Sequence, residues 1–235
     1  MSRANAPDTE YSHRAPALYV VTDRHATRGR PLVDVLARVL DGAARAGVSP
    51  GTVAIQLREK DLDARALLQV ALSLRALTAR HGAALYVNDR ADVALDAGAD
   101  GVHLSGTSLS PSEIAVIAPT LSIAISAHSP GDIARATALA ATENAKIRFA
   151  VLGPIFDTPS KRGYGAPLGL PALREVTARA LPVLAIGGVS VGNSRACLDA
   201  GAAGIACIRA LLADENPEEI AFSISRAILE GAPTH

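Results

Sequence analysis

Short apolar runs recur along the chain at regular intervals, and polar stretches separate them. Runs this short and this continuous are typical of strands that are buried on both faces, as in a parallel sheet. We therefore expect strands at residues 17–21, 52–57, 85–87, 101–104, 121–127, 147–152, 181–186 and 204–208.

Between most of these runs, apolar residues recur at the three- and four-residue spacing of an amphipathic helix. The clearest case covers residues 63–80, where Leu67, Ala71, Leu74 and Leu77 share one face. Gly98, which follows the helical pattern of residues 91–97, is a common helix stop. Further helices are expected at residues 31–45, 130–141, 170–178, 191–200 and 218–229.

Eight strands that alternate with helices in 235 residues predict an α/β fold, a single (β/α)8 barrel that covers residues 16–235. An open, doubly wound sheet is the alternative, because periodicity does not prove that the sheet closes. We expect residues 1–15, a polar stretch without the apolar core of a signal peptide, to form a disordered tail. No composition change marks a linker or a second domain.

Composition adds few constraints on function. The chain has 23 acidic and 23 basic side chains, so net charge gives no argument for nucleic acid or for an anionic membrane. No apolar run reaches the length of a membrane span. Cys197 and Cys207 lie in apolar segments without metal-site spacing, which predicts two reduced, buried thiols and a cytoplasmic protein.

Polar residues follow nearly every predicted strand. In a barrel, the carboxyl ends of all strands meet at one rim, where ligands bind. Cations and small hydroxyl residues dominate this set, which indicates an anionic, phosphorylated ligand. The set comprises Gln56, Arg58, Lys60, Asn88, Asp89, His103, Ser105, Ser126, His128, Thr158, Ser160, Lys161, Gly187, Gly188, Ile208 and Arg209.

Two of these strand ends suit phosphate. Alternation places Gln56, Arg58 and Lys60 on one side of their strand as a set of donors. A solvated charged turn is the alternative interpretation of these residues. Gly187 and Gly188 precede a helix, where free backbone N–H groups and the helix dipole favour an anion. A plain tight turn is the alternative for the two glycines.

Other strand-end residues also have two readings. Asp89 is a candidate magnesium ligand, or the N-cap of the helix that follows. His128 is a candidate proton-transfer residue, or an ordinary hydrogen-bonded side chain. His103 lies within a strand, where simple burial explains it. The long loop at residues 153–167 is expected to be a lid over the site, with a disordered insertion as the alternative.

Five motifs, in this order, resemble those of the thiamine phosphate synthases and of their close relatives, the thiazole tautomerases. They are QLREK at residues 56–60, YVNDRADVALDAGADGVHL at 86–104, SAH at 126–128, LGPIFDTPSKRG at 152–163 and AIGGV at 185–189. The resemblance spans roughly residues 17–215 and implies a TIM barrel, in agreement with the periodicity.

The synthase resemblance assigns roles to the strand-end residues. In that reaction a pyrimidine diphosphate loses diphosphate, and the nitrogen of a thiazole phosphate captures the carbocation. The resemblance implies that Asp89 binds Mg2+ and that Ser126 lies beside the reacting groups. It implies diphosphate contacts from Gln56, Arg58, Lys60 and Lys161, a pyrimidine contact from Asn88, and thiazole phosphate contacts from Thr158, Ser160, Gly188 and the backbone near Ile208.

One segment departs from the synthase pattern. After GVHL, synthases usually continue with Gly-Gln-Glu-Asp, whose last carboxylate is a second magnesium ligand. Here Ser108 stands at that position, and a hydroxyl is a much weaker ligand for Mg2+ than a carboxylate. The residues at 109–111 resemble the tautomerase branch instead. Tautomerases are metal-independent isomerases whose histidine corresponds to His128.

The expected function is therefore a thiamine phosphate synthase that uses Mg2+. Two alternatives stay open at this point: a thiazole tautomerase, and a non-catalytic barrel that binds thiazole or thiamine phosphate. In each case the partners are small phosphorylated molecules rather than nucleic acid or membrane. The sequence leaves the oligomeric state open, a homo-oligomer included.

Overall fold

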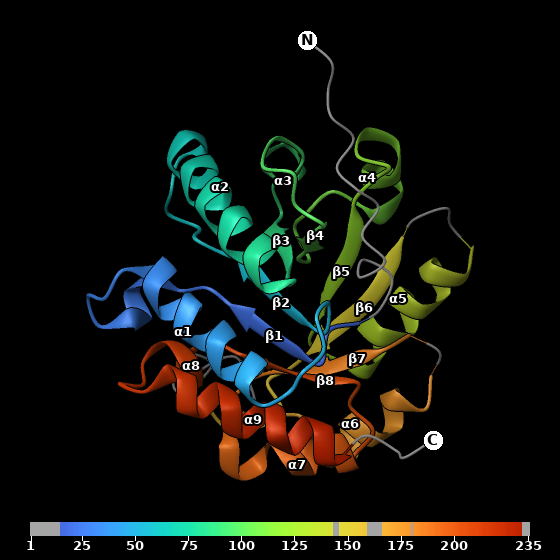
Figure 1. Cartoon of the computed structure of the whole chain (residues 1–235). Coiled ribbons are helices and arrows are strands. Elements are labelled where there is room, and N and C mark those ends of the chain that lie inside the picture. Colours follow the sequence, from blue (N-terminus) through green and yellow to red (C-terminus); the bar gives the residue numbers. More distant parts are fainter. Residues whose placement is uncertain (1–14, 143–145, 159–165, 180, 232–235) are drawn as a thin grey trace.

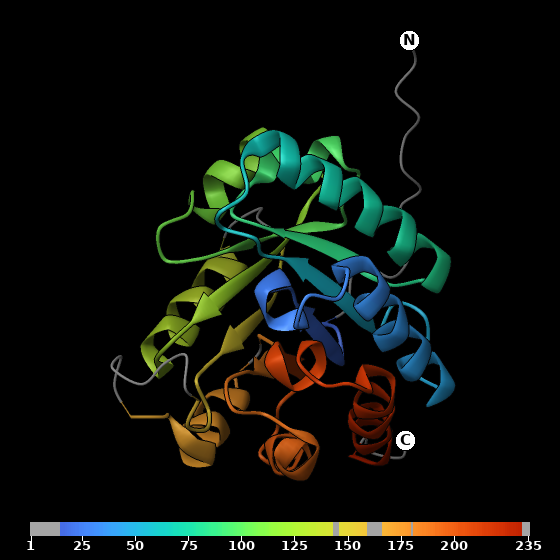
Figure 2. The ribbon, with the colours of Figure 1, turned by 90° about the vertical axis from the view of Figure 1, so that its left-hand side faces the viewer.

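The chain folds into a closed barrel of eight parallel strands with its helices on the outside, as Figures 1 and 2 show. The structure is a computed structural model that describes residues 15–142, 146–158, 166–179 and 181–231. The strands follow one another in sequence order, and β1 pairs with β8 through Leu18 and Ile205. The predicted (β/α)8 barrel is therefore confirmed, and the open sheet is wrong.

Every strand begins and ends within two residues of its expected position. They are β1 (Leu18–Val21), β2 (Val53–Leu57), β3 (Ala84–Asn88), β4 (Gly101–Leu104), β5 (Ser122–Ala127), β6 (Ile147–Leu152), β7 (Val183–Ala185) and β8 (Gly204–Cys207). Nearly every strand residue is buried, which is why the strands read as continuous apolar runs.

The helices form the outer layer. They are η2 (Arg24–Thr27), α1 (Leu32–Arg45), α2 (Ala64–His81), α3 (Ala91–Asp96), α4 (Pro111–Ile117), α5 (Pro130–Thr142), α6 (Gly169–Thr177), α7 (Val191–Asp199), α8 (Arg209–Leu212) and α9 (Pro217–Gly231). Helix α9, drawn in red, packs beside α1, drawn in blue, and this contact brings the last helix to the first (Figure 1).

Three short helices were not predicted. Helix α4 begins with a capping box between Ser110 and Glu113 and has a proline in its first turn, a pattern that marks a helix start. The helix was not predicted because its apolar face is weak: Val116 and Ile117 are exposed, and only Ile114 is buried within the helix. Elements η2 and α8 span four residues each, too few for a periodic pattern.

Alternate strand residues face inward and fill the barrel. Three aromatic rings dominate this layer: Tyr19, Tyr86 and Phe149 meet edge to face, with ring centroids 5.2–5.9 Å apart. The other members are small or branched, so the interior is a packed core rather than a channel. The inner layer consists of Tyr19, Val21, Ala54, Ala84, Tyr86, Ala124, Phe149, Val151, Leu184 and Ala206.

Cys197 and Cys207 are both buried and form no disulfide, as expected. Within the described ranges, no helix has the length and apolar character needed to cross a bilayer. Residues 1–14 of the expected N-terminal tail lie outside the described part of the chain, and so do residues 159–165 of the expected lid.

Candidate active site

A cavity of about 530 Å³ lies over the carboxyl ends of the strands, within the size range of small-molecule sites. We call it the strand-end cavity. Most of the predicted site residues line it: Gln56, Arg58, Lys60, Asn88, Ser126, His128, Thr158, Gly187, Gly188, Ile208 and Arg209. Asp89 is next to the lining residues Asn88 and Ser105, whereas Ser160 and Lys161 lie outside the described residues.

A second hollow, of about 540 Å³, lies outside the barrel against η2, α1 and α2. None of the predicted site residues and no strand residue lines it, although Arg24 and Glu59 follow the carboxyl ends of β1 and β2. In a (β/α)8 barrel the ligand binds at those ends. The strand-end cavity is therefore the candidate active site.

An amide–carboxylate chain runs along the ends of β2 and β3. Gln56 is buried, and its Nε2 donates to Asn88 Oδ1 at 2.9 Å. Asn88 Nδ2 in turn donates to Asp89 Oδ2 at 2.7 Å. Each side chain fixes the orientation of the next, so the amide groups reach the cavity already placed for a ligand.

The residues after β2 alternate between the cavity and the protein. Arg58 and Lys60 are exposed and line the cavity, whereas Glu59 between them is buried. Glu59 accepts from the backbone N–H of Arg24 at 3.1 and 3.2 Å and from Arg24 Nη1 at 3.1 Å. A wholly solvated charged turn, the alternative from the sequence, is thus wrong for Glu59.

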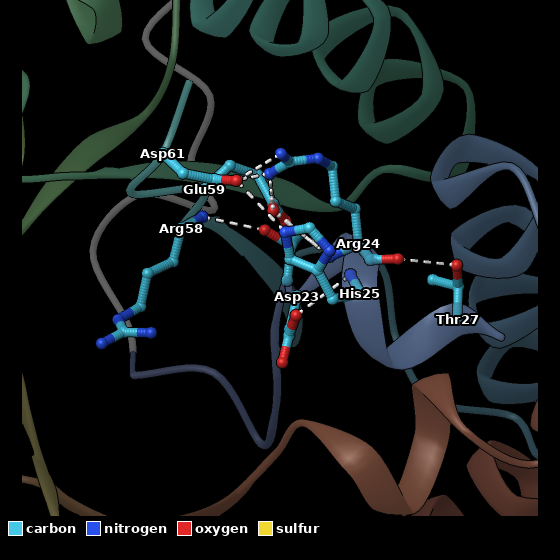
Figure 3. A network of polar contacts seen from close by, with 8 residues as sticks. Asp23, Arg24, His25, Thr27, Arg58, Glu59 and Asp61 are labelled. Atoms are coloured by element: carbon cyan, nitrogen blue, oxygen red, sulfur yellow. Dashed lines mark hydrogen bonds and ion pairs between the residues drawn. The ribbon is translucent and has the colours of Figure 1, made fainter. Parts of the chain in front are cut away.

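Arg24 connects this turn to η2. Its guanidinium group also donates to both carboxylate oxygens of Asp61. Figure 3 shows Glu59 and Asp61 gathered around Arg24, while the side chain of Arg58 extends away from that group. The backbone N–H of Arg58 is held separately, by Thr22 Oγ1 at 2.8 Å. Arg58 and Lys60 therefore extend from a turn whose other contacts are held by Arg24 and Thr22.

Asp89 adopts a left-handed backbone conformation, with φ of 60°, at the end of β3. Its N–H donates to the carbonyl of His103, and its carboxylate accepts from the N–H and hydroxyl of Ser105 and from the hydroxyl of Ser108. Burial alone would raise the pKa of Asp89, but these hydrogen bonds outweigh it, so the pKa lies below its ordinary value.

The alternative role of Asp89 as a helix N-cap is wrong. The residue in the cap position of α3 is Arg90, and that cap has no side-chain hydrogen bond. Asp89 instead ties the end of β3 to the loop after β4, through the two serines that bind its carboxylate. Ser108 therefore does contact the candidate metal ligand, as its position in the motif implies.

The group around Asp89 fits Mg2+ only in part. Its donors are one carboxylate and two hydroxyl groups, all hard oxygen ligands. In the described part of the chain, no three His, Cys, Asp or Glu side chains gather at one point. Mg2+ is commonly held by one or two carboxylates with substrate phosphates and water. The residues thus supply part of a magnesium coordination shell, and substrate phosphates and water would have to supply the rest.

His128 and Ser126 stand at the end of β5 and have different surroundings. The Nδ1 atom of His128 lies 2.9 Å from the carbonyl oxygen of Gly153. A carbonyl oxygen only accepts, so Nδ1 carries a proton and Nε2 has the lone pair when the ring is neutral. Ser126 Oγ lies 2.8 Å from Nε2 of the buried His103.

Backbone groups form the opposite side of the cavity. Gly187 and Gly188 have φ of 90° and 66°, and the segment after β6 packs against them. Phe156 N–H donates to the carbonyl of Gly187 at 2.9 Å, and a Cβ on Gly188 would lie 2.6 Å from the carbonyl oxygen of Asp157. These glycines therefore permit a close backbone approach as well as a turn.

The end of β8 contributes Ile208 and Arg209 to the same side. Ile208 is the N-cap residue of α8, and Arg209 is the exposed first residue of that helix.

Ten lining residues had not been assigned from the sequence, and those with reactive or polar side chains are Asp23 and Cys207. Tyr19 was also missed, although its hydroxyl lies 3.0 Å from His103 Nδ1. The alternation of residues in β1 places Tyr19 inward, and this alternation is the feature of the sequence that could have identified it. Its partner could not be read from the chain, because His103 lies 84 positions away.

Comparison with known proteins agrees with this geometry. Residues 18–211 match the profile of the family described as thiamine monophosphate synthase. The thiamine-phosphate synthase of Methanoculleus marisnigri is 41% identical over 88% of this chain and 92% of its own length. That of Albidiferax ferrireducens is 39% identical over 92% of this chain and 93% of its own length.

A solved structure matches as well. The thiamine phosphate pyrophosphorylase from Pyrococcus furiosus superposes with a TM-score of 0.78 and 30% sequence identity, and the match covers 95% of this chain and 98% of that one. The profile match extends over all eight strands of the barrel. The chain belongs to the thiamine monophosphate synthase family.

Proposed function

We propose that the strand-end cavity joins a hydroxymethylpyrimidine diphosphate to a thiazole phosphate and releases diphosphate. The chain is a transferase of the thiamine-phosphate synthase type, as its named relatives are. One observation carries the proposal: the cations Arg58 and Lys60 share one cavity with the backbone of Gly187 and Gly188 across the barrel. Such a cavity can hold two phosphorylated groups at once.

The reaction breaks one bond and forms one. The C–O bond between the pyrimidine methylene and the diphosphate breaks, and its electron pair leaves with the diphosphate. The lone pair of the thiazole nitrogen then forms the new C–N bond. Arg58 and Lys60 stabilise the negative charge that develops on the leaving group. The Gln56–Asn88 pair orients the pyrimidine half, and the closed barrel below excludes water from the carbocation.

Magnesium has a place in this proposal beside Asp89. A bound Mg2+ would add positive charge at the leaving diphosphate. Asp89 would hold it, with Ser105 and Ser108 as neutral neighbours. Because the pKa of Asp89 is lowered, the carboxylate stays ionised at neutral pH and can act as a ligand.

The thiazole phosphate is assigned to the other side of the cavity. Thr158, Gly188 and the backbone at Ile208 line that side. The family resemblance adds Ser160 to it, whereas Lys161 is assigned to the diphosphate. Both substrates would then occupy one cavity, and the proximity of the thiazole nitrogen to the pyrimidine methylene would supply part of the rate.

An isomerase remains a second candidate because of one specific observation. His128 Nε2 has the lone pair that a proton-transfer residue needs, since Nδ1 donates to Gly153. The names of the relatives favour the transferase, and an isomerase has no use for two cations at the diphosphate position. A barrel that binds the same phosphates without catalysis has no observation of its own in its favour.

Product assays separate these functions. Purified full-length chain with Mg2+ and both substrates is expected to form thiamine phosphate and diphosphate in equal amounts. Arg58→Gln should lower kcat/KM by about 100-fold or more, because it removes charge at the leaving group. The control is Arg80→Gln, an exposed arginine at the end of α2, which should leave the rate unchanged.

Two results would contradict the transferase. One is the absence of diphosphate release with saturating substrates and Mg2+. The other is metal-independent proton exchange on a thiazole carboxylate phosphate that disappears in His128→Ala, which would assign the chain to the isomerases.

A further inference from the structure

A row of three hydrogen-bonded side chains connects the barrel interior to the strand-end cavity. The hydroxyl of Tyr19 on β1 lies 3.0 Å from His103 Nδ1 on β4. His103 Nε2 lies 2.8 Å from Ser126 Oγ on β5. Tyr19 is 0% exposed and His103 is 2% exposed, so only Ser126 and the edge of His103 reach the cavity.

The row is held rigidly by ring packing. The rings of Tyr19 and His103 are stacked, with an interplanar angle of 19° and centroids 5.7 Å apart. Tyr86 and Phe149 contact the ring of Tyr19 edge to face from other directions. The phenol therefore cannot turn its hydroxyl away from His103 without disturbing the packed core.

The protonation states of the two buried groups are fixed by their surroundings. His103 is 2% exposed and stacked on Tyr19, and burial of this kind disfavours a charged imidazolium, so the ring is neutral and carries one proton. Burial also raises the pKa of Tyr19 well above its ordinary value, so the phenol keeps its proton. The row thus contains three protons, one on each side chain, and they can be ordered in two directions.

The two directions differ in what happens to the buried proton. If Tyr19 donates to Nδ1, then Nε2–H donates to Ser126 and the serine proton points to the cavity. In the reverse order, the proton of the Tyr19 hydroxyl is left among the aromatic rings. Among the described residues, His103 is the hydrogen-bond partner of that hydroxyl. A buried donor without an acceptor is unfavourable, so the first order is favoured.

We propose that Tyr19 is a positioning residue that acts through the Nε2–H tautomer of His103 to hold the Ser126 hydroxyl as a hydrogen-bond donor toward the bound substrate. Ser126 then selects a ligand with an acceptor atom, such as a ring nitrogen or an oxygen, beside the reacting carbon. The identity of that ligand rests on the proposed function, whereas the direction of the row rests on the buried groups alone.

The direction can be measured without any reaction. In full-length protein labelled with 15N-histidine, long-range proton–nitrogen correlation spectra distinguish the two tautomers of His103. We expect the Nε2–H tautomer in the wild-type protein. Tyr19→Phe removes the donor to Nδ1, so the Nδ1–H tautomer should become populated. Observation of the Nδ1–H tautomer in the wild type, or an unchanged tautomer in Tyr19→Phe, would overturn the proposal.

A matched control exists in the same aromatic group. Tyr86→Phe removes a phenol hydroxyl that bonds to Ser122 and not to His103, so the His103 tautomer and kcat/KM should not change. If Tyr86→Phe shifts the tautomer as much as Tyr19→Phe does, the effect comes from the packing of the core and the proposal fails.

Kinetics test whether Tyr19 acts through Ser126. Tyr19→Phe is expected to lower kcat/KM for the pyrimidine diphosphate about tenfold, the size of one hydrogen bond. In a Ser126→Ala background it should have no further effect. An equal loss in that background would show a purely structural role. If the tautomer is as expected but the wild type makes no thiamine phosphate, the proposed function fails while the ordered row stands.

Discussion

The two sides of the strand-end cavity are built differently. On the β2–β4 side, charged and amide side chains meet the cavity, and hydrogen bonds link them in sequence from Gln56 to Asp89. On the β7–β8 side, the lining is largely backbone, with Gly187 and Gly188 pressed against the segment after β6. The first side supplies most of the charged side chains, whereas the second supplies mainly shape, with Arg209 as its cation.

This difference indicates how each side responds to substitution. Side chains held by hydrogen bonds can be exchanged one at a time, and the loss is that of the bonds removed. A backbone wall has no room for an added atom, so even a methyl group displaces the chain. We therefore expect the largest single effects on stability on the β7 side, although Arg58 and Lys60 lie opposite.

The strongest prediction concerns Gly188→Ala. The added Cβ would lie 2.6 Å from the carbonyl oxygen of Asp157 and 2.7 Å from the Cβ of Phe156, at a φ of 66°. We expect the free energy of unfolding to fall by about 2–4 kcal/mol, as measured by chemical denaturation. Affinity for the thiazole phosphate, measured by calorimetry, should fall more than tenfold.

The matched control for this prediction is Gly98→Ala. Gly98 has nearly the same φ, 63°, but an added Cβ there meets nothing within 4 Å. Only the conformational penalty remains, about 1 kcal/mol. Equal losses for the two variants, together with intact ligand binding in Gly188→Ala, would show that the β7 backbone does not form a wall of the site.

A smaller effect is expected for Glu59→Gln on the opposite side. One carboxylate oxygen becomes an NH2 group, which cannot accept from Arg24, so the turn that carries Arg58 and Lys60 loosens. We expect a loss of about 1–3 kcal/mol in the free energy of unfolding and a severalfold rise in KM for the pyrimidine diphosphate. Asp61→Asn, which changes the exposed partner of the same arginine, should leave KM nearly unchanged.

If Glu59→Gln destabilises the protein while KM stays constant, then the contacts of Arg24 serve only folding. The β2 side would in that case place its cations without help from the buried carboxylate.

The smallest and most conditional effect is expected for Ser108→Asp. Two carboxylates would then touch, because Ser108 Oγ contacts Asp89 Oδ1. Without metal, their repulsion should lower the melting temperature. Added Mg2+ should restore the melting temperature and raise it above that of the wild type at the same concentration, because the new carboxylate strengthens binding.

Thr107→Asp provides the control within the same loop. Thr107 is exposed and contacts Ser105 rather than Asp89, so its replacement should give no magnesium-dependent gain. A gain of the same size for both variants would mean that general negative charge, and not a second ligand beside Asp89, attracts the ion.

The sequence predicted what depends on local periodicity. Buried parallel strands are continuous apolar runs, so the barrel and its order could be predicted. The rim residues could then be predicted as well, because the carboxyl ends of all strands in a barrel lie at the same rim. Arg58 and Lys60 were assigned to one side by alternation, and the structure brings them to the same cavity.

What the sequence did not predict depends on contacts between distant residues. From the sequence, a helix cap was one interpretation of Asp89. In the structure, the loop after β4 folds back and brings Ser105 and Ser108 to its carboxylate. From the sequence, His103 was interpreted as a simply buried residue. In the structure, Tyr19 of another strand is its hydrogen-bond partner. The hydrogen-bond partners of these groups are set by barrel closure, which no local pattern reports.

Closure has a consequence for the order of assembly. Strand β1 pairs with β2 on one side. Its other edge pairs only with β8, through Leu18 and Ile205, and β8 is the last strand to be synthesised. Until then, a growing chain presents two open sheet edges, which are ready to pair with other chains. The high sequence separation of this last pairing makes it a slow step. Both sides of the cavity are therefore joined late, when nearly the whole chain has been made.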